Sequence, residues 1–504
     1  WREERIFQKS IDQRASGPLY TLYEGPPTVN ASPGIHHVLS RVFKDVFPRY
    51  KAMQGYRTPR NAGWDTHGLP VELGIEEELG FSSKTDIEAY GIDRFNKRCR
   101  ESVSQHIGEW NDLTERIGFW IDLDHPYITF DNSYIESCWW LIKQLWDKGL
   151  IYKGYRVTPH CPRCGTSLSS HEVALGYKDD TPDPSIFVRF RITSALPDGS
   201  RPEVPTYLLA WTTTPWTLTA NVALAVNSDE TYVLVQTTSD ERLILAKALA
   251  DQALGHGNWE TLREFTGSEL AGTLYERLFE PRPEFAVGGG DLQHYNRVVR
   301  ADFVSMEDGT GIVHIAPAYG QEDYDLGQSE NLPVVHTVDL GGHLLPVDKP
   351  WDGKFVKAAD SLILDDLKSR GLLYRQGIIR HTYPFCWRCD TPLVYYAKPS
   401  WYVKTTVKKD VLIEANEGIN WYPWHIKRGR FGDWLQNNVD WAFSRERYWG
   451  TPLPIWQCDE CGERECIGGY EELKTKPNVS GITDDPDFHR PYVDEISFNC
   501  TCGK

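Results

Sequence analysis

The pattern of hydrophobic and polar positions predicts a strand, a loop and a helix near the start of the chain. Residues 19–24 alternate and are rich in Tyr, which indicates a strand, and Gly25, Pro26 and Pro27 end it. Apolar residues then recur at helical spacing over residues 34–47, and we expect Pro48 to limit that helix. The polar positions expected to face away from the core are Arg41, Lys44 and Asp45. A strand, a Gly/Pro loop and a helix start in this order favour the binding of an anion.

The pattern changes farther along the chain. Residues 92–149 are mostly helical in pattern, and short segments of β character follow residue 155. The β-like segments are residues 186–191, 207–211, 231–235 and 311–315. Turn residues separate them, so we expect a compact β-rich domain within an α/β chain. Three glycines at 288–290 are expected to form a loop.

Composition narrows the class of protein. The 504 residues include 19 Trp, 25 Tyr and 19 Phe, which are too many aromatic residues for a disordered chain. No run of about 18 apolar residues occurs, so no transmembrane helix is expected, and no secretory signal is visible. The 54 basic and 71 acidic residues give a net charge of −17, which argues against nucleic-acid binding over the whole surface. Residue 1 is Trp, so we expect the chain to be part of a longer product and incomplete at both ends.

Close pairs of cysteines indicate metal sites. The pairs are Cys161 and Cys164, Cys386 and Cys389, Cys458 and Cys461, and Cys500 and Cys502. In a large chain without a secretory signal such pairs favour metal ligands over disulfides, and thiolates suit tetrahedral Zn²⁺. We therefore expect two Zn²⁺ sites of four cysteines each, with a redox dithiol as the alternative for any single pair. Cys466 is an open candidate for a ligand of the second site.

Five motifs in one order resemble those of class I aminoacyl-tRNA synthetases. They are Gly-Pro-Pro-Thr-Val-Asn at 25–30 with Gly-Ile-His-His at 34–37, Gly-Trp-Asp-Thr-His-Gly-Leu-Pro-Val-Glu at 63–72, Trp-Thr-Thr-Thr-Pro-Trp-Thr at 211–217, Gly-Thr-Gly-Ile-Val-His at 309–314 and Ser-Arg-Glu-Arg-Tyr-Trp-Gly at 444–450. The second motif looks like that of the isoleucyl enzymes of this class. The motifs cover almost the whole chain, and any one of them alone would be weak evidence for the family.

The resemblance implies a Rossmann-like catalytic domain that is interrupted by a β-rich editing domain inserted through zinc ribbons. We expect the first half of the catalytic domain at residues 1–150 and the editing domain at 181–375. Residues 151–180 and 376–400 would form the zinc-ribbon stem of the insertion. Residues 401–456 would return toward the catalytic core, and 457–504 would begin a second zinc module.

The resemblance also implies an activity. Isoleucine and ATP with Mg²⁺ would give an enzyme-bound isoleucyl adenylate, and the isoleucyl group would then pass to tRNA(Ile). Such an enzyme is expected to be a cytoplasmic monomer with no membrane partner. Gly25 and Pro26 match positions that line the amino-acid pocket, and Asp65 matches the carboxylate that holds the substrate ammonium group.

The first signature departs from the family pattern. The family has His-x-Gly-His, whereas this chain has Gly34, His36 and His37 in the order Gly-x-His-His. His36 stands where the family keeps a Gly that leaves room for adenine, which allows two readings. The site is inactive, or Gly34 supplies the space and His36 takes over the role of the missing donor. Because the residue types are permuted rather than lost, we favour an active site.

The inserted domain is expected to hydrolyse wrongly formed valyl-tRNA. One methylene is worth only about 1–3 kcal/mol in an apolar pocket, a limit for which isoleucyl enzymes are themselves the usual example. The residues that match the family's editing site are Thr212, Thr213, Thr214, Trp216, His314 and Asp323. Without the partner motif at 309–323, the Thr run would be read as β propensity alone.

Two alternatives remain open from the sequence. The first is a non-catalytic tRNA-binding paralogue, and the second is a deacylase that uses only the editing domain. A stretch that combines Arg with Trp suits an RNA surface or, equally, a packed return to the catalytic core. Its members are Arg428, Arg430, Arg445, Arg447, Trp424, Trp434, Trp441 and Trp449.

Overall fold

The computed structural model describes residues 1–280, 282–287 and 295–504, and the chain divides into two compact units. The first unit contains residues 1–153 and 401–504, and the second contains residues 154–400. Strands β4 (Ile151–Cys161) and β17 (Val394–Val403) carry the chain from the first unit into the second and back. The loop expected at residues 288–290 lies outside the described residues.

A parallel sheet forms the centre of the first unit. Its strands are β1 (Leu22–Tyr23), β2 (Arg60–Trp64) and β3 (Asp122–Ile128), in the order β1-β2-β3. The helices before the insertion are α1 (Ile6–Asp12), α2 (Ile35–Met53), α3 (Leu69–Leu79), α4 (Lys84–Tyr90), α5 (Ile92–Arg116) and α6 (Asn132–Asp147). Trp64, Phe95 and Trp110 are fully buried in the core of this unit. The strand β3 was not expected, because residues 92–149 were predicted to be mostly helical and the Asp, His and Pro of β3 give it no apolar alternation.

Helix α2 corrects two predictions from the sequence. The helix runs to Met53 and contains Pro48, which was expected to limit it. Its polar positions face inward: Arg41 is buried and donates to the Thr114 hydroxyl at 2.9 Å, and the Lys44 ammonium bonds the buried Glu24 carboxylate at 2.6 Å. The apolar face is the exposed one, with Ile35, Leu39, Val42, Phe43, Val46, Phe47, Tyr50 and Met53.

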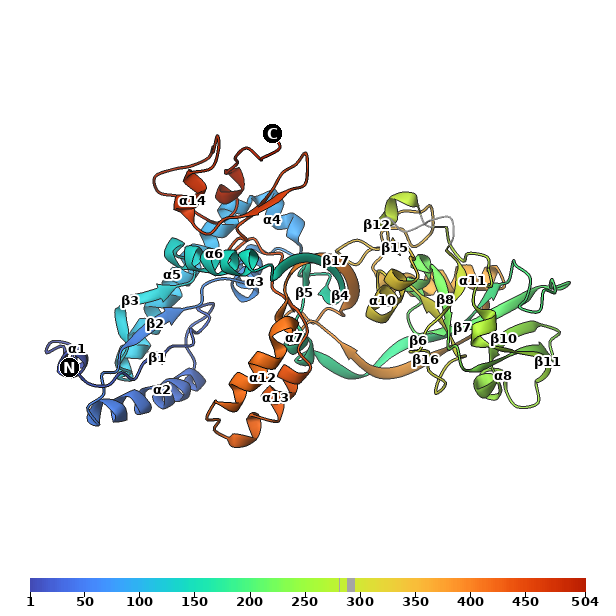
Figure 1. The fold of residues 1–504 in the computed structure, drawn as a ribbon, viewed down its shortest axis with the longest axis horizontal. Helices are drawn as coiled ribbons and strands as arrows, with labels where there is room; N and C mark the ends of the chain where they lie inside the picture. The colour runs from blue at the N-terminus through green and yellow to red at the C-terminus, as the bar shows by residue number, and fades with distance from the viewer. Residues whose placement is uncertain (281, 288–294) are drawn as a thin grey trace. The chain divides into compact units, whose positions relative to one another are not determined.

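The chain after the insertion completes the first unit. Its elements are α12 (Lys409–Glu417), α13 (Arg430–Gln436), β18 (Trp441–Ala442), β19 (Ile455–Gln457), β20 (Arg464–Cys466) and α14 (Tyr470–Lys474). Helices α12 and α13 run side by side as a hairpin (Figure 1). Farther along, Ile467, Leu473 and Phe488 pack against Ile135 and Trp139 of α6, so the chain end shares a hydrophobic core with the first half of the unit.

The second unit is β-rich, as the sequence predicts. One sheet has the order β11-β9-β10-β7-β6-β16, and another has the order β13-β8-β14. The strands are β6 (Tyr177–Arg191), β7 (Thr206–Thr212), β8 (Ala223–Val226), β9 (Thr231–Thr237), β10 (Arg242–Ala246), β11 (Trp259–Thr266), β13 (Arg297–Arg300), β14 (Ile312–Ile315) and β16 (Leu373–Pro384), with the short β5 (Thr166–Ser167), β12 (Ala286–Val287) and β15 (Val334–Val335). The long antiparallel pair of β6 and β16 can be followed in Figure 1. Three of the four segments predicted to have β character lie entirely on strands, and the fourth, 311–315, begins one residue before β14.

Short helices and 3₁₀ turns connect the strands of this unit. The helices are α7 (Ser170–Ala174), α8 (Ala250–Leu254), α9 (Gly267–Leu270), α10 (Gln321–Ser329) and α11 (Val356–Ser369), and the 3₁₀ turn η1 (Pro215–Ala220) follows β7. Ile363 and Leu367 of α11 pack with Trp216 of η1 in one core. Across the described residues of both units, no helix is long and apolar enough to cross a membrane.

Candidate functional site

The loops that follow β1 and β2 meet at one edge of the parallel sheet. The Asp65 amide donates to the Pro27 carbonyl at 3.1 Å, and the Val29 amide donates to the Asp65 carbonyl at 2.9 Å. The Thr28 hydroxyl also donates to the Asp65 carboxylate at 2.9 Å. This edge, beyond the carboxyl ends of parallel strands, is where open α/β sheets bind ligands. The structure therefore brings the Gly25–Pro26 loop beside Asp65.

Burial raises the pKa of Asp65, while the bonds from Thr28 and from the backbone amide of His67 partly offset the effect. Asp65 and His67 line a cavity of about 1000 Å³. Arg445, Arg447 and Thr451 also line it. A half-buried carboxylate on the wall of such a cavity suits the binding of a small cation, because charge-assisted hydrogen bonds are strong there. His36 and His37 are not among the residues that line this cavity.

The first turn of α2 fixes the tautomer of His37. The Gly34 amide donates to His37 Nδ1 at 2.9 Å, which places an acceptor nitrogen at that position. Burial, then the neighbouring His36 and Arg41, lower the pKa of His37, so its ring is neutral and its Nε2 carries the proton. A ring N–H at the start of a long helix is a donor suited to a phosphate oxygen.

The exchange of Gly and His in the first signature has a steric consequence. A Cβ atom at Gly34 would lie 2.9 Å from Cε1 and 3.0 Å from Nδ1 of the His36 ring. The His36 and His37 rings lie 3.8 Å apart between centroids, and His37 packs on Trp110 at 4.6 Å. The exposed His36 ring would therefore have to move if residue 34 carried a side chain.

The motif at 444–450 packs on the motif at 63–72. The Glu72 carboxylate of α3 accepts from the amides of Tyr448 at 2.7 Å and Trp449 at 2.8 Å. The Trp449 indole donates to the Thr66 carbonyl at 2.6 Å, and the Gly68 amide donates to the Trp449 carbonyl at 3.1 Å. Burial raises the pKa of Glu72, and Arg447 opposes that rise. Sequence reasoning gave Glu72 and Trp449 no such role, because no periodicity connects positions so far apart.

In the second unit, the Thr-rich turn is bonded to His314. Thr212 ends β7, and its hydroxyl accepts from the Thr214 amide at 3.1 Å. Thr213 lies between them in the same turn. The Thr217 hydroxyl donates to the Thr214 carbonyl at 2.7 Å and lies 3.0 Å from His314 Nε2. Since that hydroxyl proton is already used, His314 Nε2 is the donor and Nδ1 is an acceptor. Nδ1 is buried and has no hydrogen-bond partner among the described residues, as expected of an atom that meets a ligand.

Asp323 of α10 lies beside the end of β14, the strand that carries His314. Its carboxylate accepts from the Ala316 amide at 2.8 Å, two residues after His314. Burial raises the pKa of Asp323 to about 6, and burial lowers that of His314 to about 4. Trp216 is buried in η1, and its amide donates to the Asp360 carboxylate of α11 at 3.1 Å. Asp360 was missed from the sequence, because it belongs to none of the motifs.

Both cysteine sets form compact tetrads. In each set the four sulfur atoms lie within 4.8 Å of one another. Contacts of 3.4 Å between Cys161 and Cys389 and 3.7 Å between Cys458 and Cys502 are too long for disulfides, and all cysteines are free. They approach the roughly 3.8 Å between sulfurs that tetrahedral Zn–S bonds of about 2.3 Å require. Both tetrads therefore fit a metal ion, and Cys466 belongs to neither.

The Arg and Trp residues of the return segment separate into two groups. Trp449 is buried and Arg447 lies near Glu72, so these two belong to the packed core. Trp424, Trp434 and Trp441 are exposed around the α12–α13 hairpin. The interpretation as a packed return therefore holds for Trp449 and Arg447, and an RNA surface at the exposed Trp residues stays a prediction.

Comparisons with known proteins agree along the whole chain. A model of the family described as tRNA synthetases class I (I, L, M and V) matches residues 1–500. All of the chain aligns, at 57% identity, with a protein of Dehalococcoides mccartyi named isoleucine–tRNA ligase, of which it covers 51%. Proteins of the same name from Clostridium novyi and Thermus thermophilus are 51% and 52% identical over all of the chain, which covers 47% and 46% of them. The chain thus spans about half the length of the curated relatives it matches.

Proposed function

The chain belongs to the class I tRNA synthetases of the I, L, M and V group, and from this we propose that the enzyme containing it ligates isoleucine to tRNA(Ile). The observation that carries the proposal is the meeting of the 25–30 and 63–72 motifs at one sheet edge, with Asp65 on the cavity wall. The names of the relatives support isoleucine as the amino acid.

Each site residue has a role in the proposed first step. The Asp65 carboxylate holds the ammonium group of isoleucine, and the backbone of Gly25 and Pro26 bounds the same site. His37 Nε2–H and the exposed His36 ring donate to phosphate oxygens of ATP, which enters with Mg²⁺. Charge moves toward pyrophosphate as the adenylate forms, and fixed donors at that place stabilise the transition state. Gly34 keeps the space that the His36 ring needs.

The experiment is ATP–pyrophosphate exchange by the complete enzyme with isoleucine, valine or leucine as the amino acid. Isoleucine should support the fastest exchange, and Asp65→Asn should raise the KM for isoleucine because it removes the counter-charge of the ammonium group. Glu77→Gln removes an exposed carboxylate of α3 and serves as the matched control. Exchange no faster with isoleucine than without an amino acid would refute the synthetase proposal.

We also propose that the second unit hydrolyses valyl-tRNA. Thr212, Thr213 and Thr214 bind the ester end, Asp323 holds the amino group, and His314 limits the side chain that can enter. Trp216, bonded to Asp360, supports the turn. Asp323→Ala should leave isoleucylation unchanged and let valyl-tRNA accumulate. Unchanged clearance of valyl-tRNA by this variant would count against the assignment.

The remaining properties are proposals of the same kind. The tetrads fit Zn²⁺, so metal analysis should find two zinc ions per chain. The enzyme is proposed to act as a cytoplasmic monomer on tRNA. If hydrolysis of valyl-tRNA is found without isoleucine-dependent exchange, an editing-only protein replaces the synthetase proposal, and tRNA binding without either activity indicates a non-catalytic paralogue.

A further inference from the structure

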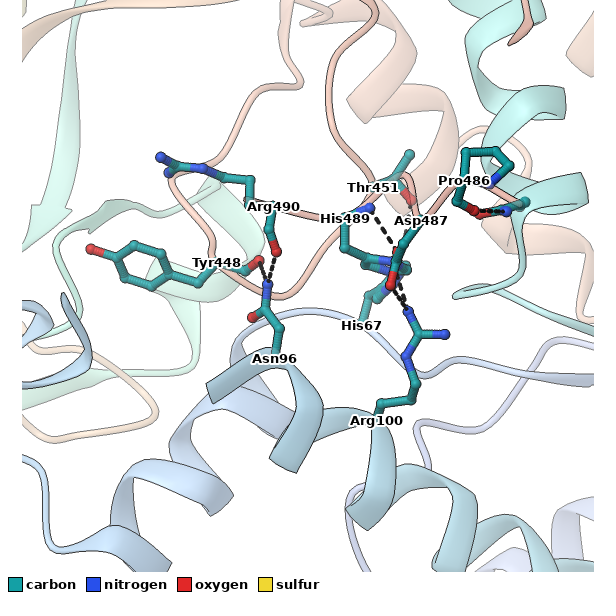
Figure 2. A network of polar contacts seen from close by, with 10 residues as sticks. His67, Asn96, Arg100, Tyr448, Thr451, Pro486, Asp487, His489 and Arg490 are labelled. Atoms are coloured by element: carbon teal, nitrogen blue, oxygen red, sulfur yellow. Dashed lines mark hydrogen bonds and ion pairs between the residues drawn. The ribbon is translucent and has the colours of Figure 1, made fainter. Parts of the chain in front are cut away.

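Two histidines from distant parts of the first unit meet at the wall of the amino-acid cavity. His67 Nε2 lies 2.8 Å from His489 Nε2, and His489 Nδ1 lies 2.6 Å from the Asp487 carboxylate. Arg100 extends from α5 to the same carboxylate at 2.8 Å (Figure 2). The His489 ring is buried and stacks on Trp449, with centroids 4.4 Å apart and planes at 13°.

The segment that carries His489 is firmly attached to the helices of the first unit. The Asn96 side chain donates to the carbonyls of Tyr448 at 2.9 Å and Arg490 at 2.7 Å (Figure 2). The Asn132 side chain donates to the Pro486 carbonyl at 2.6 Å. The backbone around His489 is therefore held independently of the His67 contact, so this imidazole is a fixed point against which His67 can be oriented.

The contacts around Asp487 define one end of this chain of residues. Burial alone would raise the pKa of Asp487, but the bonds from His489 and the charge of Arg100 outweigh it and lower that pKa to about 2. Asp487 is therefore ionised and accepts from both neighbours, since a guanidinium has only donors. His489 Nδ1 lies 2.6 Å from this carboxylate and 3.1 Å from the Arg100 guanidinium, so its proton bonds the carboxylate. The Nε2 atoms of His489 and His67, 2.8 Å apart, share one hydrogen bond that fixes the two rings against each other.

His67 is neutral, and its second ring nitrogen faces Thr451. Burial, then His489 and Arg100, lower the pKa of His67 to about 3. Its Nδ1 lies 3.5 Å from the Thr451 hydroxyl. Both His67 and Thr451 line the cavity that contains Asp65. The chain of contacts from Asp487 through two imidazoles therefore ends in the cavity.

We propose that Asp487 and His489 are positioning residues that hold the His67 side chain in one orientation, and through it hold Asp65 for the amino group of the substrate. The link between His67 and Asp65 is the His67 backbone amide, which bonds the Asp65 carboxylate. A His67 side chain released from His489 anchors this backbone segment, and with it the carboxylate, less firmly. The inference rests on the proposed synthetase function and adds a role for a segment more than 400 residues from Asp65 in the sequence.

The test uses Asp487→Asn, which keeps the shape of the side chain but removes its charge. The variant therefore loses the charged acceptor that holds His489 Nδ1 and the Arg100 guanidinium. In the complete enzyme, we expect the KM for isoleucine in ATP–pyrophosphate exchange to rise about tenfold, as for other changes to groups that orient a ligand-binding residue. The kcat should stay within about threefold, because His36 and His37 are untouched. Asn132→Ala, which loosens the same segment without touching either ring, should change the KM less than about twofold.

A double-mutant cycle separates positioning from general stability. If Asp487 acts through His67, then Asp487→Asn should add almost nothing to the KM of His67→Asn. Additive effects, or an equal rise in KM for Asn132→Ala, would overturn the inference. If Asp487→Asn does not fold, Asp487→Glu takes its place in the same cycle. This variant keeps the carboxylate charge, so its KM for isoleucine should stay close to that of the wild type. Absence of isoleucine-dependent exchange in the wild type would instead refute the proposed function.

Discussion

Asp323 of the second unit gives the sharpest quantitative prediction. Its carboxyl is buried, and its pKa is raised from the ordinary 3.8 to about 6. A carboxyl whose pKa is higher in the folded than in the unfolded state favours folding while it is protonated. Its contribution is therefore present at low pH and is lost as the pH rises from about 4 to about 6. This sign is opposite to that of a carboxylate in an ordinary salt bridge.

The magnitude follows from the two pKa values. At about 1.4 kcal/mol per pH unit, the difference between 3.8 and about 6 corresponds to about 3 kcal/mol of lost stability at pH 7.5. Asp323→Asn removes the charge and keeps an oxygen that can accept from the Ala316 amide. We therefore expect Asp323→Asn to stabilise the second unit by up to about 3 kcal/mol at pH 7.5 and by less than about 1 kcal/mol at pH 4. The same variant should lose the clearance of valyl-tRNA.

The assay is denaturant-dependent hydrogen exchange of peptides from β8 and β14 in the complete protein, at both pH values. These strands form the sheet beside Asp323, so their slowest exchange reports the stability of that unit. Glu322→Gln removes an exposed neighbouring carboxylate of α10 and is the control, with an expected change within about 0.5 kcal/mol. An Asp323→Asn variant that is no more stable at pH 7.5, or equally stabilised at both pH values, would refute the reasoning from burial.

Three further outcomes are expected. Gly34→Ala should lower kcat/KM in ATP–pyrophosphate exchange at least about tenfold, because the new Cβ displaces the His36 ring. Gly74→Ala is the control, because the new atom there has open space around it. Equal activities of the two variants would contradict the steric argument. A chelator should remove metal from the 458–502 tetrad before the buried 161–389 tetrad, as two phases in a zinc-indicator assay, whereas one phase would disagree. Phe43→Gln should change the free energy of unfolding by less than about 0.5 kcal/mol, because Phe43 lies on the exposed apolar face of α2. A loss of more than about 1 kcal/mol in denaturant unfolding would contradict that exposure.

The sequence predicts the local elements around the motifs better than the partners of their side chains. The β character of the second unit could be predicted because its strands carry apolar alternation and turn residues. Helix α2 could be predicted as a helix, but not which side faces inward, because Arg41 and Lys44 find buried partners in Thr114 and Glu24. An amphipathic pattern shows that a helix has two sides and leaves open which of them is covered.

Contacts between distant motifs were beyond sequence reasoning. Glu72 bonds the amides of Tyr448 and Trp449, and His67 meets His489. Each pair joins positions more than 370 residues apart. Such pairs depend on how the chain returns after the insertion, and neither residue type nor spacing encodes that path. The motifs indicate which segments carry chemistry, whereas the structure shows which buried polar groups hold them.

The close approach of Gly34 and His36 makes the effect of a substitution at one position depend on the residue at the other. The family pattern carries a histidine at the first position and a glycine at the third. A chain with side chains at both positions could not keep the His36 ring where it lies here, since a Cβ at residue 34 comes within 2.9 Å of it. Restoring only the first histidine of the family pattern would therefore turn the His36 ring away, whereas exchanging both residues together would avoid the contact.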